Sequence, residues 1–98
     1  MVRLPLARTF DLIINTVSAP VDLDAYLSLL AVDGVLVSVG GPPEPMRVHS
    51  GSLSPQRRIL TGSIIGGLPQ AQEMLDFCAE HGIGAEIEVI GIDQVNDA

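Results

Sequence analysis

Three short apolar runs, separated by segments with helical spacing, constrain the fold of this chain more than any other feature. The runs cover residues 10–17, 35–40 and 59–65, and they are rich in β-branched residues. Nearly continuous apolar runs of this length are typical of strands covered on both faces of a parallel sheet. Parallel neighbours are joined by right-handed crossovers, usually through a helix. The pattern therefore predicts an α/β fold with three parallel strands and flanking helices.

Two helices are predicted from apolar spacing and end signals. The first covers the apolar positions of 23–31, with Asp22 as its N-terminal cap and Gly34 as its stop. The second has Pro69 in its first turn and ends at Gly82. Its apolar stripe is formed by Ala71, Met74, Leu75, Cys78 and Ala79.

A fourth strand is predicted over residues 85–90, with a different character from the first three. Polar and apolar residues alternate there, so this strand is expected to be half exposed or to belong to another sheet. Asp93 is placed to cap a last helix. The proline-rich stretch 42–55 is predicted to be mostly loop.

Composition excludes several classes of function. A length of 98 residues fits one small domain, and a net charge of −7 with only five basic residues argues against a nucleic-acid partner. Cys78 is the single cysteine, which excludes an internal disulfide and favours a reducing cytoplasm. There is no apolar run of about 20 residues and no signal-peptide pattern near Met1. We expect a soluble, cytoplasmic chain without a membrane partner.

A ligand site is expected at the carboxyl ends of the parallel strands, where such sheets bind ligands. Gly40 and Gly41 follow the second run and permit either a close approach of a cofactor or an ordinary turn, and spacing alone favours the turn. The glycines of 62–67 do not have the spacing of the dinucleotide fingerprint, and no P-loop is present. No phosphate-binding motif is therefore predicted.

No catalytic residue and no metal ligand is assigned from the residue types present. His49, His81 and Cys78 do not form the spacing of a zinc site. We interpret His49 as solvated, His81 as a helix-end residue, and Cys78 as a small core side chain. We interpret Arg57 and Arg58 as part of a solvated charged face rather than as a phosphate-binding site.

Four segments together resemble a known family. Residues 15–17, 33–40, 60–67 and 72–82 resemble, in order and spacing, the cinnamyl alcohol dehydrogenase branch of the zinc-dependent medium-chain dehydrogenases. The resemblance implies that residues 10–84 are the second half of a Rossmann-type nucleotide-binding domain, and that 85–98 begin the return to a catalytic domain. Residues 1–9 do not resemble the family, which leaves open a natural truncation, an alternative start or a cut made for expression.

The resemblance also implies a cofactor, NADP(H), and positions that contact it. Thr16 and Val17 would lie beside the nicotinamide ribose, and Gly40 would let the backbone approach the cofactor closely. Ser63, Ile64 and Ile65 would follow the nicotinamide ring and its carboxamide. The family's zinc ligands, proton relay and glycine-rich fingerprint are missing from the sequence. The implied reaction, hydride transfer between alcohol and aldehyde, is therefore not expected from this chain alone.

Two other functions remain open at this stage. The first is a non-catalytic module that dimerises through strand 59–65, with itself or with a longer homologue. The second is a weak nucleotide-binding module. In the resembled family this strand pairs with its twin across a two-fold axis, and the run 10–17 would offer a second unpaired edge. A homo-oligomer is therefore expected. The sequence does not determine the substrate or the choice between NAD and NADP.

Overall fold

The computed structural model describes residues 6–98, so residues 1–5 of the predicted segment 1–9 lie outside the described part of the chain. The first unit ends at Ile65 and the second covers Gly66–Ala98. In the first unit the order is β1 (Phe10–Asn15), α1 (Leu23–Leu27), β2 (Leu30–Ser38) and β3 (Ile59–Gly62). Two 3-10 turns precede β3, at Ser50–Ser52 and Ser54–Gln56. The second unit contains α2 (Leu68–Glu80) and a 3-10 turn at Ile92–Gln94.

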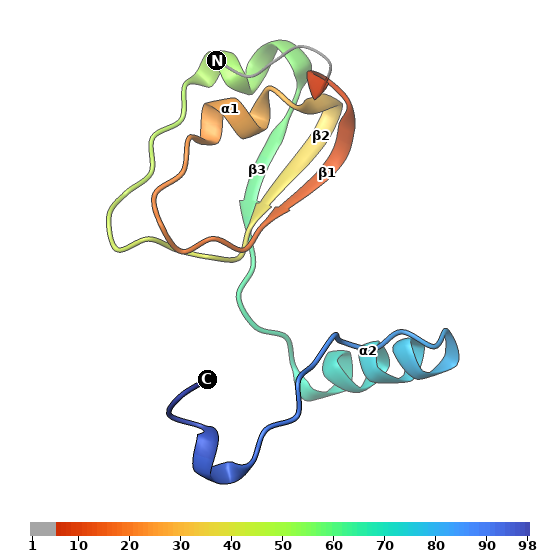
Figure 1. Cartoon of the computed structure of the whole chain (residues 1–98). Coiled ribbons are helices and arrows are strands. Elements are labelled where there is room, and N and C mark those ends of the chain that lie inside the picture. The colour runs from red at the N-terminus through yellow and green to blue at the C-terminus, as the bar shows by residue number, and fades with distance from the viewer. Residues whose placement is uncertain (1–5) are drawn as a thin grey trace. The chain divides into compact units, whose positions relative to one another are not determined.

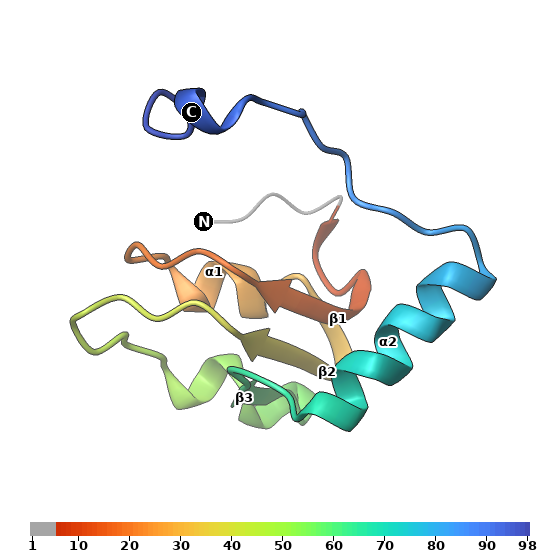
Figure 2. The same ribbon diagram turned by 90° about the horizontal axis from the view of Figure 1, so that it is seen from below.

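The three strands form one parallel sheet in the order β1-β2-β3 (Figures 1 and 2). Ile14 of β1 is opposite Val37 of β2, which is in turn opposite Thr61 of β3. The predicted α/β fold with three parallel strands is confirmed. The third strand is shorter than predicted, since it ends at Gly62 and leaves 63–65 beyond the sheet.

The first helix is much shorter than predicted. Asp22 caps it as expected, because its Oδ1 accepts the Ala25 N–H at 3.2 Å, but α1 ends at Leu27 instead of reaching Gly34. Leu30 already pairs with Phe10 in the sheet, and it is fully buried. Burial of Leu30 and its strand pairing therefore prevail over the helical spacing of the following residues.

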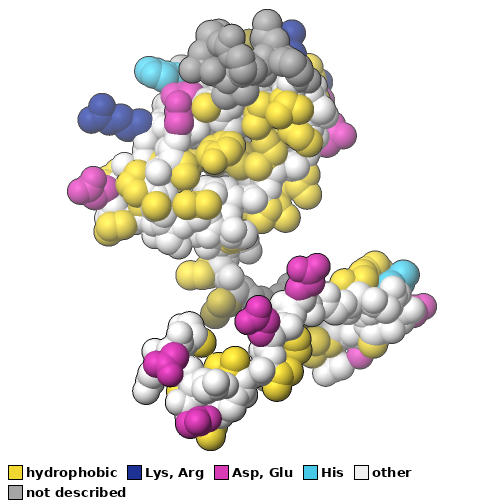
Figure 3. All heavy atoms as spheres, in the orientation of Figure 1, with side chains coloured by type: hydrophobic (Ala, Val, Ile, Leu, Met, Phe, Trp, Pro, Cys, Tyr) yellow, Lys and Arg dark blue, Asp and Glu magenta, His cyan; other side chains and the backbone are white. Residues whose placement is uncertain are grey.

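Helix α1 lies against the sheet of the first unit (Figure 1), and the core of this unit lies on the face under α1. Its buried side chains are Leu23, Leu27, Leu30 and Leu36. The other face of β1 presents Phe10, Leu12 and Ile14, which are 40%, 56% and 59% exposed. Within residues 6–65 the first unit therefore does not provide the predicted cover for this second face of β1, and apolar side chains reach the surface of that unit (Figure 3).

In the second unit the predicted helix is present and the predicted strand is not. In α2, Pro69 lies in the first turn, and the chain leaves the helix at His81 before Gly82, whose φ is 65°. The predicted strand 85–90 is absent, because residues 83–91 have no strand or helix in the structure. A strand needs a neighbouring backbone, and the described part of the second unit offers none. Gly91 rather than Asp93 occupies the N-cap position of the last 3-10 turn.

No helix among residues 6–98 combines the length and apolar character that a membrane crossing requires.

Candidate functional site

A shallow hollow of about 430 Å³ opens at the carboxyl ends of β2 and β3. It lies wholly within the first unit, at the end of the sheet where parallel strands place their ligand sites. Its lining consists of the last residue of each strand and the residues that follow. These are Ser38, Val39, Gly40, Gly41, Gly62, Ser63 and Ile64.

The strand ends around this hollow are tied together by hydrogen bonds. The carbonyl oxygen of Asn15, at the end of β1, accepts the N–H groups of Val39 at 2.9 Å and Gly40 at 3.3 Å. The Ser38 hydroxyl donates to the Gly40 carbonyl at 2.9 Å, and the Ser63 N–H donates to the Ser38 carbonyl at 3.2 Å. All three strand ends therefore belong to one bonded network.

Gly40 is required by a close backbone contact in this network. A Cβ at Gly40 would lie 2.6 Å from the carbonyl carbon of Val17 and 2.9 Å from that of Thr16. Real Cβ atoms do not approach backbone so closely, so only glycine fits there. The neighbouring Gly41 has no atom within 4 Å of such a Cβ. The sequence suggested a cofactor approach or a turn at these glycines, and the structure shows that Gly40 meets the β1 turn.

Five of the six residues predicted to bind cofactor lie in two groups at this end of the sheet. Gly40, Ser63 and Ile64 line the hollow. Thr16 and Val17 adjoin it through the backbone contact with Gly40. Ile65 is outside the lining, and its side chain is 85% exposed.

Sequence reasoning missed Asn15 and Ser38. Both are polar residues at the end of a mostly apolar strand, and that position was the available signal. Asn15 is 7% exposed, and its Oδ1 accepts the Val17 N–H at 3.0 Å. Neither side chain is ionisable, so both act here as hydrogen-bonding groups that shape the strand ends.

Asp24 holds the loop that follows β2 onto α1. Its Oδ1 accepts the His49 backbone N–H at 2.9 Å and the Ser52 hydroxyl at 2.7 Å. These two donors, and His49 nearby, lower the pKa of Asp24. The His49 side chain is 89% exposed, as the sequence predicted, with Nε2 at 3.8 Å from Asp24 Oδ2.

The two adjacent arginines have different roles. Arg57 forms an exposed ion pair with Asp33, with Nη2 and Oδ2 2.8 Å apart. Arg58 is half-buried and donates to the Leu30 carbonyl at 2.8 Å and to the Ser52 carbonyl at 3.0 Å. Partial burial, together with the charge of Arg8, lowers the pKa of Arg58. The prediction of a solvated pair is wrong for Arg58, because its guanidinium bonds one carbonyl at the start of β2 and one in the 3-10 turn at Ser50–Ser52, and such carbonyls need a donor.

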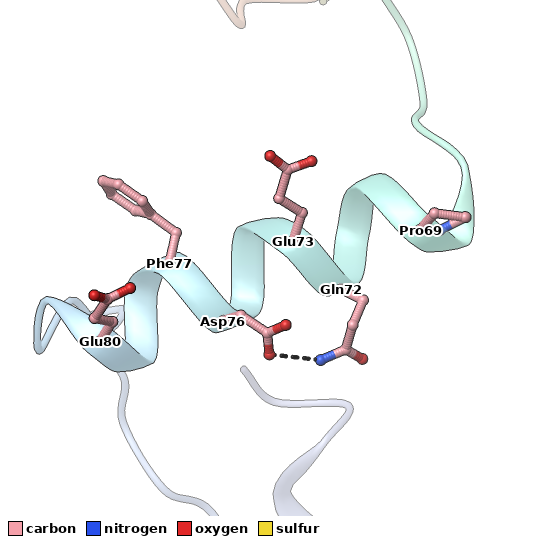
Figure 4. Close-up of a pocket in the computed structure, with 6 residues that line it drawn as sticks. All are labelled: Pro69, Gln72, Glu73, Asp76, Phe77 and Glu80. Atoms are coloured by element: carbon pink, nitrogen blue, oxygen red, sulfur yellow. Dashed lines mark hydrogen bonds between the residues drawn. The ribbon is translucent and has the colours of Figure 1, made fainter.

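The second unit has a separate hollow along one face of α2 (Figure 4). Its polar contact is the bond from Gln72 Nε2 to Asp76 Oδ1 at 2.8 Å. His81 stacks on Phe77, with ring centroids 4.1 Å apart, and its Nδ1 lies 2.9 Å from the Phe77 carbonyl.

Within residues 6–98 no three His, Cys, Asp or Glu side chains converge as metal ligands do. No set of zinc ligands is therefore assigned among the described residues.

Comparison with known proteins agrees with this architecture. The family model of zinc-binding dehydrogenases matches residues 4–80. NADP-dependent alcohol dehydrogenase C 1 of Mycolicibacterium smegmatis is 60% identical over 93 residues, which are 95% of this chain and 27% of that protein. Aldehyde reductase YahK of Escherichia coli is 51% identical over 93% of this chain and 26% of its own length.

Solved structures match as well. A cinnamyl alcohol dehydrogenase of Sorghum bicolor superposes with a TM-score of 0.88 at 38% identity, over 95% of this chain and 26% of that one. The enzyme of Helicobacter pylori complexed with NADP(H) gives 0.76 at 36% identity, over 90% and 26%. The chain thus spans about a quarter of the length of these relatives. It belongs to the family of zinc-binding dehydrogenases, of the medium-chain alcohol dehydrogenase type.

Proposed function

We propose that this chain supplies the nicotinamide side of an NADP(H) site in an alcohol–aldehyde oxidoreductase. The observation that carries the proposal is the hollow at the carboxyl ends of β2 and β3, in a family whose similar members are named as NADP-dependent alcohol dehydrogenases. A solved relative of the same fold was determined with NADP(H). Because Cys78 is the single cysteine of the sequence, we propose the reducing cytoplasm as the compartment in which this site works.

The residues around the hollow suit the flat end of such a cofactor. Ile64 and Ile65 are 86% and 85% exposed, and thus offer apolar surface to a ring. Ser63 adds a hydroxyl beside them, and the open space over Gly41 leaves room for close approach. Bound NADP(H) would supply the hydride chemistry, and this chain's own residues would orient the ring and exclude water from one side of it.

A titration with NADPH tests this proposal directly. We expect the 98-residue chain to bind NADPH weakly, with a dissociation constant on the order of 1 mM or higher, because the helix N-terminus that normally receives the pyrophosphate is not encoded. Amide chemical shifts should move at Gly40, Ser63 and Ile64, and the shift should weaken in Ser63→Ala. Shifts spread over α2 instead, or none at all, would contradict the proposal.

The proposal does not extend to turnover by these 98 residues alone. The sequence has neither the glycine-rich fingerprint nor a set of His and Cys residues with the spacing of a zinc site. We expect no oxidation of alcohols and no reduction of aldehydes above a buffer blank. Activity that survives a chelator and further purification would contradict this expectation.

A second candidate function is dimerisation through β3. Within the described residues β3 pairs only with β2, so its outer edge is open. The strand has neither lysine nor proline, the residues that discourage pairing with another chain, and Ile59 is 52% exposed. A two-fold pairing of β3 with its copy would close this edge.

Light scattering at low micromolar concentration tests the dimer. Proline at position 64 removes an N–H group just beyond β3, so Ile64→Pro should shift the native chain from dimer toward monomer. The control is Ile87→Pro, which changes an isoleucine that is 77% exposed in the second unit. A native monomer would exclude the dimer, and a dimer that Ile64→Pro leaves intact would count against pairing that continues beyond Gly62.

A further inference from the structure

Asn15 is a buried polar residue at the end of a mostly apolar strand, and its burial needs an explanation. It is 7% exposed at the end of β1. Its Oδ1 accepts the Val17 N–H at 3.0 Å, while its Nδ2 has no hydrogen-bond partner among residues 6–98. Burial of an unpaired amide donor is costly, and an apolar side chain would avoid that cost. Some other property of this side chain must therefore offset it.

Asn15 forms hydrogen bonds through both its backbone and its side chain at the junction of two strand ends. The backbone carbonyl of Asn15 holds Val39 and Gly40, and its side chain holds Val17. Val17 and Gly40 are also the pair whose backbones meet too closely for a Cβ at Gly40. One residue thus fixes both partners of the tightest contact beside the hollow.

We propose that Asn15 is a positioning residue for the cofactor end of the sheet, which rests on the function proposed above. Asn15 is not part of the lining and acts through Val17 and Gly40. Its side-chain oxygen bonds the backbone two residues ahead, which is the geometry of an Asx turn. This turn sets the path of Thr16 and Val17, and the carbonyl sets Gly40 against it.

A matched pair of variants separates positioning from packing. Asn15→Thr and Asn15→Val have the same shape, but only threonine offers an oxygen to the Val17 N–H, as in the weaker turns that Ser and Thr form. Amide hydrogen exchange is measured without cofactor at Val17 and Gly40. In Asn15→Val, Val17 exchange should be about tenfold faster than in Asn15→Thr, because its hydrogen bond is lost.

A control and a fallback keep this comparison decisive. Ile13→Val trims a neighbouring side chain of the same strand that packs against the core, and it should leave the exchange ratio of Val17 to Gly40 unchanged. If a valine at position 15 prevents folding, Asn15→Ala against Asn15→Ser gives the same comparison with smaller side chains. Equal Val17 exchange in the oxygen-bearing and oxygen-free variants would overturn the proposal.

The second measurement connects the turn to cofactor. In the NADPH titration, we expect the dissociation constant of Asn15→Val to be roughly five- to tenfold higher than that of Asn15→Thr. Equal constants in the presence of unequal exchange would overturn the positioning role. If the native chain shows no shift with NADPH, the proposed function fails, while the exchange comparison still decides whether Asn15 fixes the turn.

Discussion

The two units of this chain contain helices with similar apolar patterning and very different burial. Leu23 and Leu27 of α1 are 3% and 0% exposed, whereas α2 buries none of its residues within the second unit although it is longer, at 13 residues against 5. Met74 and Leu75 on its apolar stripe remain 53% and 56% exposed. An apolar stripe therefore predicts which face of a helix is available for packing, and the sheet beneath α1 provides the packing.

The distribution of charge also changes at the boundary between the two units, after Ile65. All five basic residues lie within 1–65, where five acidic residues balance them, so the whole net charge of −7 falls on 66–98. In the first unit charged side chains also make structural bonds, as Asp24 and Arg58 do. The first unit thus contains the core, the anchored loop and the strand-end hollow, and the second contributes an acidic surface.

The largest expected effect tests the difference in burial. Leu27→Ala should destabilise the first unit by about 2–5 kcal/mol, because it removes a fully buried side chain and leaves a cavity. Leu75→Ala makes the same chemical change in α2 and should alter that unfolding free energy by less than about 0.5 kcal/mol. Urea unfolding followed by Tyr26 fluorescence measures both. Similar losses for the two variants would show that α2 is buried in solution.

Two adjacent glycines give the next comparison, now within the first unit. Gly40→Ala should destabilise it by about 1–3 kcal/mol, because the added Cβ meets the Val17 backbone. Gly41→Ala places the same methyl group in open space and should change stability by no more than about 0.5 kcal/mol. The same urea experiment applies. If both variants are equally stable, the strand ends must be looser than their hydrogen bonds indicate.

Much of the fold was predictable because local patterns and sheet geometry agree. The strand cores of 10–17 and 35–40, the Asp22 cap and the stop of α2 at Gly82 all follow from local signals. The predictions that failed depended on distant partners. The end of α1 at Leu27 depends on the pairing of Leu30 with Phe10, and the predicted strand 85–90 lacks a neighbour among the described residues.

The candidate site was predictable only in outline. The rule that ligands lie beyond strand ends, together with the family resemblance, indicated the region of Gly40 and Ser63. The bonds of Asn15 and Ser38 depend on how neighbouring strands align, and no local spacing encodes that alignment. The difference between Arg57 and Arg58 has the same origin, because it depends on which carbonyls the fold leaves unbonded.

Substitutions of the two adjacent arginines should have smaller effects on stability, and they test how Arg58 holds the loop that follows β2. Arg58→Lys should destabilise the first unit by roughly 1–2 kcal/mol, because one ammonium group cannot bond both the Leu30 and Ser52 carbonyls as the guanidinium does. Arg57→Lys keeps the charge beside Asp33 and should change stability by less than about 0.5 kcal/mol. Equal effects on urea unfolding would mean that the Arg58 bonds contribute little.

The smallest expected effect appears only at acid pH and concerns Asp24. Its folded-state pKa is lowered by the His49 N–H and the Ser52 hydroxyl, from an ordinary value of 3.8. A carboxylate with a depressed folded-state pKa stabilises the fold fully above its unfolded pKa, and this contribution is lost as the pH falls through the folded value. Stability should therefore fall below pH 3.8, and it should fall less steeply in Asp24→Asn, which has no carboxylate to protonate. Urea midpoints at several pH values between about 2 and 6 measure the difference, with Glu44→Gln, which removes an exposed carboxylate, as the matched control. An Asp24→Asn profile parallel to the native one would show that the bonds from His49 and Ser52 do not hold the loop onto α1 in solution.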